Sequence, residues 1–277
     1  MPPHDKPLVS VVIATYNDKP TSLHAALRSV VDQTWKDWEI VIADDSTRRE
    51  SVEVIEGYAK LLGDRLVFRH HERRLGLVAS INEALGLARG ELIARMDGDD
   101  ICVPDRLESQ VRHFAEHPDV GILGGNIEII SDGGEALSVR RYRKDRDGIR
   151  RVSFIRNPLA QPTVMLRKSV LDMIGVYDAR FRKAEDYELW LRALKHSVVI
   201  ENLDRVLVCY RVPDDYSRKR DADNWKFGIK AKLMHFSWRY PLRSLAGIAL
   251  SCVLLVTPTR LLDALYRRDH RAPIIYG

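Results

Sequence analysis

The chain has 277 residues, enough for one large domain or for one domain with an appendage. Hydrophobic residues make up 45% of it and charged residues 30%, which is typical of a folded globular protein and excludes a disordered one. The net charge of +5 is uneven, because residues 218–271 hold 12 Lys or Arg against 4 Asp or Glu, and this basic tail indicates a membrane or a nucleic acid as partner.

The cysteines and the N-terminus bear on the compartment. Three cysteines, Cys102, Cys209 and Cys252, are odd in number and widely spaced, without a Cys-x-x-Cys pair. This pattern argues against a disulfide framework or a zinc site and favours a reducing compartment. The opening "MPPHDKP" has no apolar segment of the kind found in a secretory signal. We therefore expect the chain to be cytoplasmic.

The first 110 residues alternate between strand and helix patterns. β-Branched runs predict strands, and apolar residues at helical spacing predict the helices between them, the first with Leu23, Leu27, Val30 and Val31 on one face. This order predicts an α/β fold with a mostly parallel sheet and helices on both faces. Strands are expected at Leu8–Ala14, Glu39–Ala43, Arg65–His70 and Glu91–Met96, and further helices at Glu50–Leu62 and Leu77–Ala88, the latter closed by Gly90.

The second half is less regular. The segment 121–130 predicts a strand, 162–175 a strand running into a helix that ends at Gly175, and 204–212 a closing strand. In "EDYELWLRAL", Tyr187, Trp190, Leu191 and Leu194 have the spacing of an amphipathic helix. No internal repeat is found.

Polar clusters follow three of the predicted strands. "TYND" comes after the first, "DDST" after the second and "DGDD" after the fourth. Turns and helix caps explain any one such cluster. Ligands of open α/β sheets, however, bind at the carboxyl ends of the strands, so the three clusters together favour a ligand site.

Asp97, Asp99 and Asp100 place three carboxylates within four residues. Clustered carboxylates serve cation binding or share a proton. An EF-hand counted from Asp97 fails, because its sixth position is Cys102 where glycine is needed. A Mg²⁺ or Mn²⁺ site that bridges the protein to a nucleotide diphosphate remains, because Mg²⁺ takes few carboxylates and completes its shell with phosphates and water.

Four segments in order resemble one family. "VSVVIATYN", "EIVIADDST", "GLVASINEALGLARGELIARMDGDD" followed by "VPDRLESQ", and "FRKAEDYELWLR" together resemble the inverting family 2 glycosyltransferases of the GT-A fold, over Leu8 to Arg211. The resemblance implies a metal-dependent enzyme of the hexosyltransferase type. Its donor would be a nucleotide-diphosphate sugar, with UDP expected as the nucleotide.

The resemblance also implies which residues bind the nucleoside. Thr15, Tyr16, Asp44 and Asp45 would hold it. The Tyr16 ring would stack on the base, which is worth ~1 kcal/mol. A carboxylate of Asp44 or Asp45 would accept the imide N–H of uracil or thymine.

Asp97 and Asp99 match the family's Asp-x-Asp motif. By the resemblance, Asp99 would ligate Mn²⁺ or Mg²⁺, and Asp97 would contact the ribose, the metal or its waters. Asp100 is expected to be structural, capping the turn toward Pro104.

The "AED" of Ala184–Asp186 is similar to the family's catalytic-base motif. Inversion needs a base that takes the proton of the acceptor hydroxyl. Asp186 is expected in that role with Glu185 as the alternative, although both acids would also favour a helix start. The Gln-x-x-Arg-Trp motif of processive members is absent, so we expect one sugar per visit.

The tail predicts contact with a membrane. Trp225, Ile229, Leu233, Phe236 and Tyr240 recur at helical spacing beside lysines, which predicts an interfacial amphipathic helix. Residues 244–259 carry no charge but fall short of the ~20 apolar residues that a bilayer span needs. They would form an interfacial or re-entrant anchor, a helix packed on the enzyme body, or a span. So long an apolar stretch argues against nucleic acid.

These features predict a GT-A domain over 1–212, with a nucleotide-binding half over about 1–110 and an acceptor-side half over 111–212, and a helical, membrane-associating extension over 213–277. The extension would hold the enzyme peripherally on the cytoplasmic face of the inner (plasma) membrane. The acceptor there would be a glycan or lipid-linked glycan in surface polysaccharide assembly. Gly124 and residues 161–163 are expected to shape the sugar pocket.

Three alternatives were weighed. A sugar-phosphate nucleotidyltransferase needs a glycine-rich loop after the first strand, and "TYNDKPTS" has no glycine. An NAD(P) dehydrogenase lacks its Gly-x-Gly-x-x-Gly motif here. An inactive relative that binds nucleotide or scaffolds partners is disfavoured by the intact candidate metal and base positions.

Overall fold

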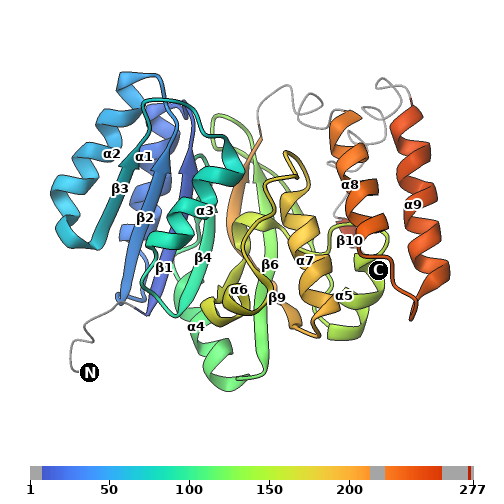
Figure 1. Ribbon diagram of the computed structural model, residues 1–277. Coiled ribbons are helices and arrows are strands. Elements are labelled where there is room, and N and C mark those ends of the chain that lie inside the picture. Colours follow the sequence, from blue (N-terminus) through green and yellow to red (C-terminus); the bar gives the residue numbers. More distant parts are fainter. Residues whose placement is uncertain (1–7, 213–221, 258–273, 276–277) are drawn as a thin grey trace.

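The computed structural model describes residues 8–212, 222–257 and 274–275. In this part of the chain a single sheet of ten strands runs through the molecule, in the order β10-β7-β6-β8-β4-β1-β2-β3 with β5 and β9 off this path. Figure 1 shows the N-terminal half at one end of the sheet and the tail helices at the other.

The N-terminal half is the parallel part of the sheet, and its predicted bounds are confirmed to within one residue. Strand order β4-β1-β2-β3 is parallel throughout. Helices connect these strands, as a parallel arrangement requires. The elements are β1 (Val9–Thr15), α1 (Pro20–Val31), β2 (Trp38–Asp44), α2 (Arg49–Leu62), a 3₁₀ turn (Gly63–Arg65), β3 (Leu66–His70), α3 (Leu77–Leu87) and β4 (Leu92–Asp97).

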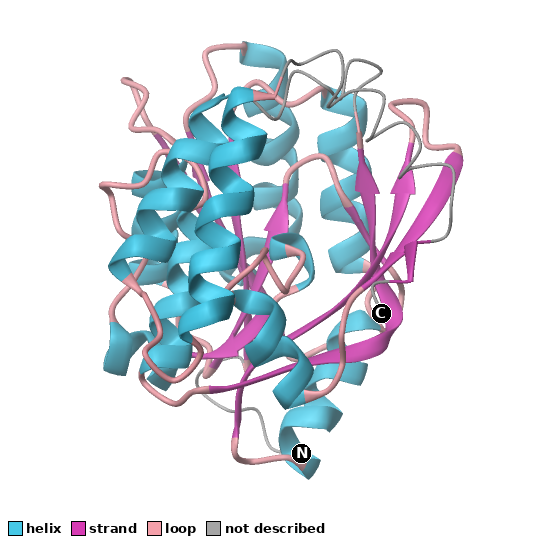
Figure 2. Ribbon diagram, turned by 90° about the vertical axis from the view of Figure 1, so that its right-hand side faces the viewer, coloured by secondary structure: helices cyan, strands magenta, loops and turns pink. Residues whose placement is uncertain are grey.

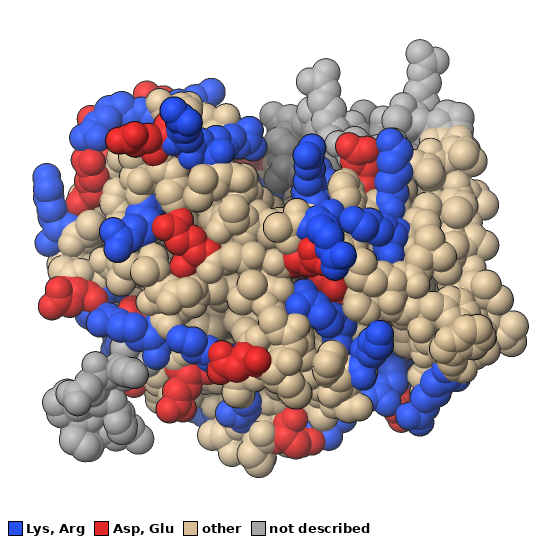
Figure 3. Space-filling model, viewed as in Figure 1, with Lys and Arg blue, Asp and Glu red and all other residues tan. Residues whose placement is uncertain are grey.

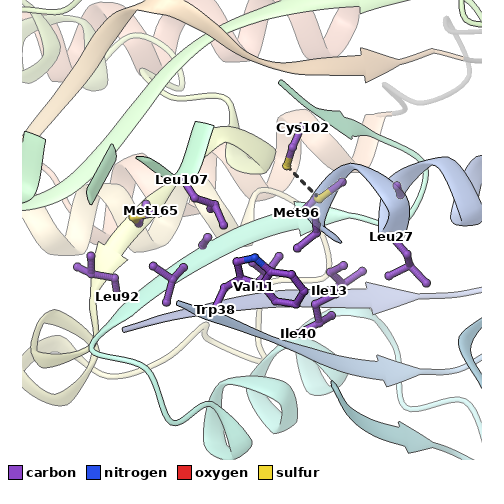
Figure 4. Packing of buried hydrophobic residues seen from close by; sticks show 14 of the residues in the cluster. Val11, Ile13, Leu27, Trp38, Ile40, Leu92, Met96, Cys102, Leu107 and Met165 are labelled. Atoms are coloured by element: carbon purple, nitrogen blue, oxygen red, sulfur yellow. Dashed lines mark hydrogen bonds between the residues drawn. The ribbon is translucent and has the colours of Figure 1, made fainter. Parts of the chain in front are cut away.

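Both faces of these strands are buried. Val11 and Ile13 of β1 pack with α1 and α2 on one face, whereas Val12 packs with α3 on the other. Figure 4 shows the first cluster, in which Trp38 lies among residues of β1, β2 and β4. Cys102 Sγ lies 3.3 Å from Met96 Sδ there, and all three cysteines are free thiols. Burial on both faces explains the continuous apolar runs in the sequence.

The C-terminal half is mixed, so the expected parallel pairing holds mainly for the first half. Strand β8 is antiparallel to β4 and β6, and β6 pairs antiparallel with β7 and parallel with β9. Pro162 and Thr163 lie in a 3₁₀ turn and not in the strand predicted there. The elements are β5 (Ile101–Cys102), α4 (Arg106–Glu116), β6 (Val120–Ile130), β7 (Ala136–Arg141), α5 (Arg146–Ser153), the turn Gln161–Thr163, β8 (Met165–Arg167), α6 (Lys168–Ile174), α7 (Glu185–Lys195) and β9 (Val199–Arg211).

The tail forms two helices, α8 (Ala222–Met234) and α9 (Pro241–Val256), and a short strand, β10 (Ile274–Ile275), parallel to β7. The predicted single helix through Tyr240 is wrong. Helix α8 ends at Met234, so Phe236 and Tyr240 lie in the connection, where the Tyr240 ring is 5.7 Å from that of Phe154. Because β10 joins the sheet, the tail is also not wholly helical.

Helix α9 packs on the enzyme body along a stripe of small residues, Ser244, Gly247 and Ser251. Lys232 of α8 holds it there: its Nζ donates to Gly247 O at 2.9 Å and Ser251 Oγ at 2.6 Å, and to Ile155 O at 2.8 Å. Of the three alternatives for residues 244–259, packing on the body is observed, with 258 and 259 outside the described residues. No helix in the described ranges is long and apolar enough to cross a bilayer.

Candidate active site

The three polar clusters meet at one edge of the parallel sheet. In the strand register, Thr15 of β1 lies opposite Asp44 of β2, and Ala14 lies opposite Asp97 of β4. This convergence follows from parallel pairing, which brings the carboxyl ends of neighbouring strands to the same edge. The candidate nucleotide residues therefore lie on adjacent strands, as the sequence predicts.

Asp44 is buried, and both its oxygens accept hydrogen bonds from the protein. Oδ1 accepts from Thr15 Oγ1 at 2.7 Å and from the backbone N of Ser46 at 3.1 Å. Oδ2 lies 2.7 Å from His70 Nδ1, and the His70 side chain is 39% exposed. Asp44 thus positions Thr15 and His70 at the mouth of the site.

Asp45 anchors the loop that leads into α3. It accepts hydrogen bonds from the backbone N–H groups of Leu75 and Gly76 and from Ser80 Oγ, and it pairs with His71 Nδ1 at 2.8 Å. Burial opposes ionisation of this carboxyl, but the backbone donors outweigh it and lower the pKa of Asp45. Four partners inside the protein give Asp45 a structural function in addition to any contact with a ligand.

Tyr16 lies at the surface. Its side chain is 42% exposed, and the Arg74 guanidinium lies 3.8 Å from the ring centroid. A flat group can stack on this ring where Arg74 does. Loop 71–76, held by Asp45, carries the arginine.

Three carboxylates, Asp18, Asp97 and Asp99, form an acidic corner beyond β1 and β4. Burial first, and then the charges of Asp99 and Asp97, raise the pKa of Asp18 to about 7. A Cβ at Gly98 would lie 2.6 Å from Asp18 Oδ2, so only glycine leaves room for that carboxylate. The sequence reasoning quoted "TYND" but assigned nothing to Asp18, its last residue.

Two arginines contact the turn that holds Asp97, Asp99 and Asp100. The buried Arg95 donates from Nη2 to Asp97 Oδ1 at 2.6 Å. Arg211 of β9 donates from its backbone N to Asp100 Oδ1 at 2.8 Å, and from Nε to the carbonyl of Asp99 at 2.9 Å. The Asp100 contact ties the turn to β9. The expected structural function of Asp100 stays a prediction.

The acidic corner fits a divalent ion whose other ligands come from a substrate. Within the described residues no group of three or more His, Cys, Asp or Glu side chains is arranged to hold a metal by itself. Mg²⁺ commonly binds one or two carboxylates and completes its shell with phosphate oxygens and water. After burial, the charges of Asp99 and Asp97 are the largest causes of the raised pKa of Asp18, as expected where carboxylates lie close together. Asp97 and Asp99 are thus suited to a shared metal–diphosphate site.

Asp186 is the second residue of α7, and the helix begins directly after Ala184, whose φ of 56° turns the chain into it. Its Oδ2 accepts from Asn157 Nδ2 at 2.6 Å and its Oδ1 from the backbone N of Tyr187 at 2.7 Å. Burial raises the pKa of Asp186, whereas these two donors favour its ionised form. Burial and the neighbouring Asp186 charge raise the pKa of Glu185 to about 7.

One cavity of about 730 Å³ joins the acidic corner to the base motif. Asp97 and Asp186 both line it, and the charge of Asp97 acts on Asp186, whereas Glu185 is not among the lining residues. Gln161 and Pro162 also line it, but Gly124 and Thr163 do not. Both are buried, and Thr163 Oγ1 accepts from the backbone N of Gly125. Their expected contribution to the shape of the sugar pocket stays a prediction.

The sequence did not predict that residues of the tail line this cavity. Helix α8 contributes Trp225 and Lys232, and helix α9 contributes Leu250, Ser251 and Leu254. Their apolar and basic spacing predicted contact with a membrane or, for residues 244–259, packing on the enzyme body as one alternative, but not a place in the cavity wall. No pattern in the sequence indicates that α9 would lie beside Asn157 and Asp186.

Comparison with known proteins identifies the family and the fold. The family model described as Glycosyl transferase family 2 matches residues 10–185. The chain belongs to this family. It is 31% identical over 273 residues to the amylovoran biosynthesis glycosyltransferase AmsE of Erwinia amylovora, covering 95% of this chain and all of that one.

Another family 2 relative and a solved structure complete the comparison. The UDP-Gal:alpha-D-GlcNAc-diphosphoundecaprenol beta-1,3-galactosyltransferase of Escherichia coli is 28% identical, with 85% of this chain and 86% of that one covered. The mannosyltransferase PcManGT of Pyrobaculum calidifontis, solved with GDP-Man and Mn²⁺, superposes with a TM-score of 0.65 at 17% identity, covering 95% and 80%. The expected GT-A fold is confirmed.

Proposed function

We propose that this family 2 glycosyltransferase moves a single sugar, with inversion, from a UDP-sugar to a hydroxyl of a lipid-linked glycan during surface polysaccharide assembly. The observation that carries the proposal is the shared cavity, because Asp97 and Asp186 face one space. A base and a diphosphate anchor in the same space are what displacement at an anomeric carbon needs. The named biosynthetic roles of the two relatives support the setting.

Asp186 is the group placed to deprotonate the acceptor. It takes the proton of the hydroxyl as that oxygen bonds to the anomeric carbon, and the bond from this carbon to the nucleoside diphosphate breaks. Asn157 orients the carboxylate through its 2.6 Å hydrogen bond. Glu185 remains the alternative base, although its side chain is buried and is not part of the cavity wall.

The donor is assigned to the edge where β1, β2 and β4 end. Tyr16 offers an exposed ring for the base, and Thr15, Asp44 and Asp45 lie on the adjacent strand ends. Asp97 and Asp99 would hold Mn²⁺ or Mg²⁺, which when bound supplies positive charge to the diphosphate. A Mn²⁺ complex of a protein with the same fold supports this assignment.

The outer face of α9 is assigned to the cytoplasmic membrane surface. Leu245 and Val253 are 55% and 58% exposed, while the opposite face packs on the body. Figure 3 shows that the surface over α9, at the right, carries few charged side chains. Arg239 and Arg243 are exposed at the start of this helix, where they can meet anionic headgroups.

The catalytic assignment is tested with Asp186→Asn, which keeps the shape of the side chain and removes the base. We expect kcat to fall by about 10²–10⁴-fold with the KM for the donor little changed. Glu185→Gln is the matched variant, and a larger loss in it than in Asp186→Asn would move the base to Glu185. NMR of the product linkage tests inversion, and a retained anomeric configuration would reject it.

The membrane assignment is tested by sedimentation with vesicles that contain anionic lipid. Leu245→Asp and Val253→Asp place charge on the exposed face, and we expect each to reduce the bound fraction severalfold because charge is costly at an apolar interface. Leu61→Asp is the control, because Leu61 is 70% exposed on α2, away from the tail. Equal binding of all variants would contradict the assignment.

A further inference from the structure

The wall of the cavity on the C-terminal side is rich in positive charge. Five cationic side chains line the cavity, Arg140, Arg143, Arg156, Lys183 and Lys232, against the two carboxylates of Asp97 and Asp186. Both carboxylates are already engaged, Asp97 by Arg95 and Asp186 by Asn157. The remaining charge of this space is therefore positive.

Two of these cations have no partner for their charge. The side chains of Arg143 and Lys183 form no ion pair or hydrogen bond among residues 8–212, 222–257 and 274–275. Both are half-buried and reach the cavity from different segments, Arg143 from beyond the end of β7 and Lys183 from the turn before α7. Lys232 Nζ, by contrast, already donates hydrogen bonds to the carbonyl oxygens of Ile155 and Gly247 and to Ser251 Oγ.

One neutral donor that lines the same cavity also lacks an acceptor. Trp225 Nε1 is a buried atom without a hydrogen-bond partner in the part of the chain that the structure describes. Leaving a buried donor unsatisfied costs about 1–3 kcal/mol, so such atoms commonly mark the position of a ligand. Arg143, Lys183 and the Trp225 indole donate hydrogen bonds, and none of them accepts one. A phosphate, which offers only acceptor oxygens at neutral pH, complements this wall better than a sugar does.

We propose that Arg143 and Lys183, with Trp225 Nε1, bind the phosphate groups that join the acceptor sugar to its lipid. The proposed function assigns the donor diphosphate to the acidic corner beyond β1 and β4, and of the three carboxylates of that corner only Asp97 lines this cavity. The apolar side of the same cavity supports a lipid, since Leu250 and Leu254 of α9 line it and Leu245 and Val253 of α9 face outward. This inference rests on the proposed function and assigns the anionic part of its acceptor.

Binding of inorganic pyrophosphate and of decyl diphosphate to the full chain, measured by calorimetry in EDTA, tests this subsite. Without a divalent ion the acidic corner repels anions, so binding under these conditions reports the cationic wall. We expect Arg143→Ala and Lys183→Ala each to weaken binding by about tenfold, and Arg143→Lys to recover part of the loss. Lys60→Ala, which removes an exposed charge on α2, should bind as the wild type does.

A competition experiment separates the two diphosphate sites. UDP added in EDTA should leave pyrophosphate binding unchanged, and in Mn²⁺ assays Arg143→Ala should raise the KM for a diphosphate-linked acceptor without changing the KM for the UDP-sugar. Displacement by UDP, or unchanged affinity in both alanine variants, would overturn the subsite. A protein that binds pyrophosphate as expected but turns over no nucleotide sugar would instead refute the proposed function.

Discussion

The close packing of α9 can be tested by adding a single methyl group at Gly247. Gly247 lies against the body so closely that a Cβ would meet the carbonyl oxygen of Phe154, with Phe154 C at 2.9 Å and Ile155 Cα at 3.0 Å. Carbon atoms prefer about 3.5–4.0 Å. Gly247→Ala therefore forces α9 outward by roughly 0.5–1 Å at least, because backbone atoms cannot rotate away as a side chain can.

The expected cost follows from three contributions. Overpacking of this kind costs about 1–3 kcal/mol, and the strained contact of Lys232 with Gly247 O can cost about 1.5 kcal/mol more. Alanine in a helix returns about 0.5–1 kcal/mol. We expect docking of α9 to weaken by roughly 2–3 kcal/mol, which amounts to a Tm lower by about 4–10 °C if the tail unfolds with the body.

The assay combines thermal unfolding with hydrogen exchange of the α9 amides, which detects undocking even where the body stays folded. Gly57→Ala in α2 is the matched control, because nothing lies within 4 Å of a Cβ there, and it should stabilise by about 0.5–1 kcal/mol. Gly247→Ala with the wild-type Tm and unchanged α9 protection would refute the packing argument.

Two further predictions concern the charges of the site. Asp99→Ala should abolish the gain in UDP affinity that Mn²⁺ gives in calorimetry while leaving the fold intact, and a variant that retains this gain would reject Asp99 as a ligand. Glu185→Gln should move the acidic limb of the pH profile of kcat/KM to lower pH, because it removes a negative neighbour of the base. Burial and Asp186 raise the pKa of Glu185 to about 7, so its contribution to stability is full below pH 4.5 and is lost as the pH rises through 7. The Tm of Glu185→Gln relative to wild type should consequently be higher at pH 8 than at pH 4.5, and an unchanged difference would contradict this linkage.

The parallel half of the fold could be predicted because its strands are buried on both faces. Continuous apolar runs such as Ile40–Ala43 and the helical spacing of α1 and α2 carry enough signal to place each element within a residue or two. In the other half, β5 has two residues and β7 (Ala136–Arg141) lies mostly at the surface, so neither has a strong apolar pattern. Their pairing depends on tertiary contacts that the local sequence does not encode.

The candidate site could likewise be predicted only in part from the sequence. Strand ends bring Thr15, Asp44 and Asp97 together through parallel pairing, so their convergence was predictable. Most of the partners that hold these groups were not, because Asn157 and Arg211 are distant in sequence from Asp186 and Asp100 and meet them only in the folded chain. The acidic residues of such a site can be predicted from sequence more readily than the residues that form hydrogen bonds with them.

The tail is a second example of contacts that the sequence did not predict. Its apolar residues look like an anchor, yet α8 and α9 also wall the cavity that holds Asp186, and Lys232 fastens both helices to the loop after α5. A membrane surface in contact with the outer side of α9 would lie one helix away from the acceptor hydroxyl. If so, lipid contact and acceptor binding are coupled. Undocking α9 by Gly247→Ala should then raise the KM for a lipid-linked acceptor, while the KM for the UDP-sugar, whose proposed site is where β1, β2 and β4 end, stays the same.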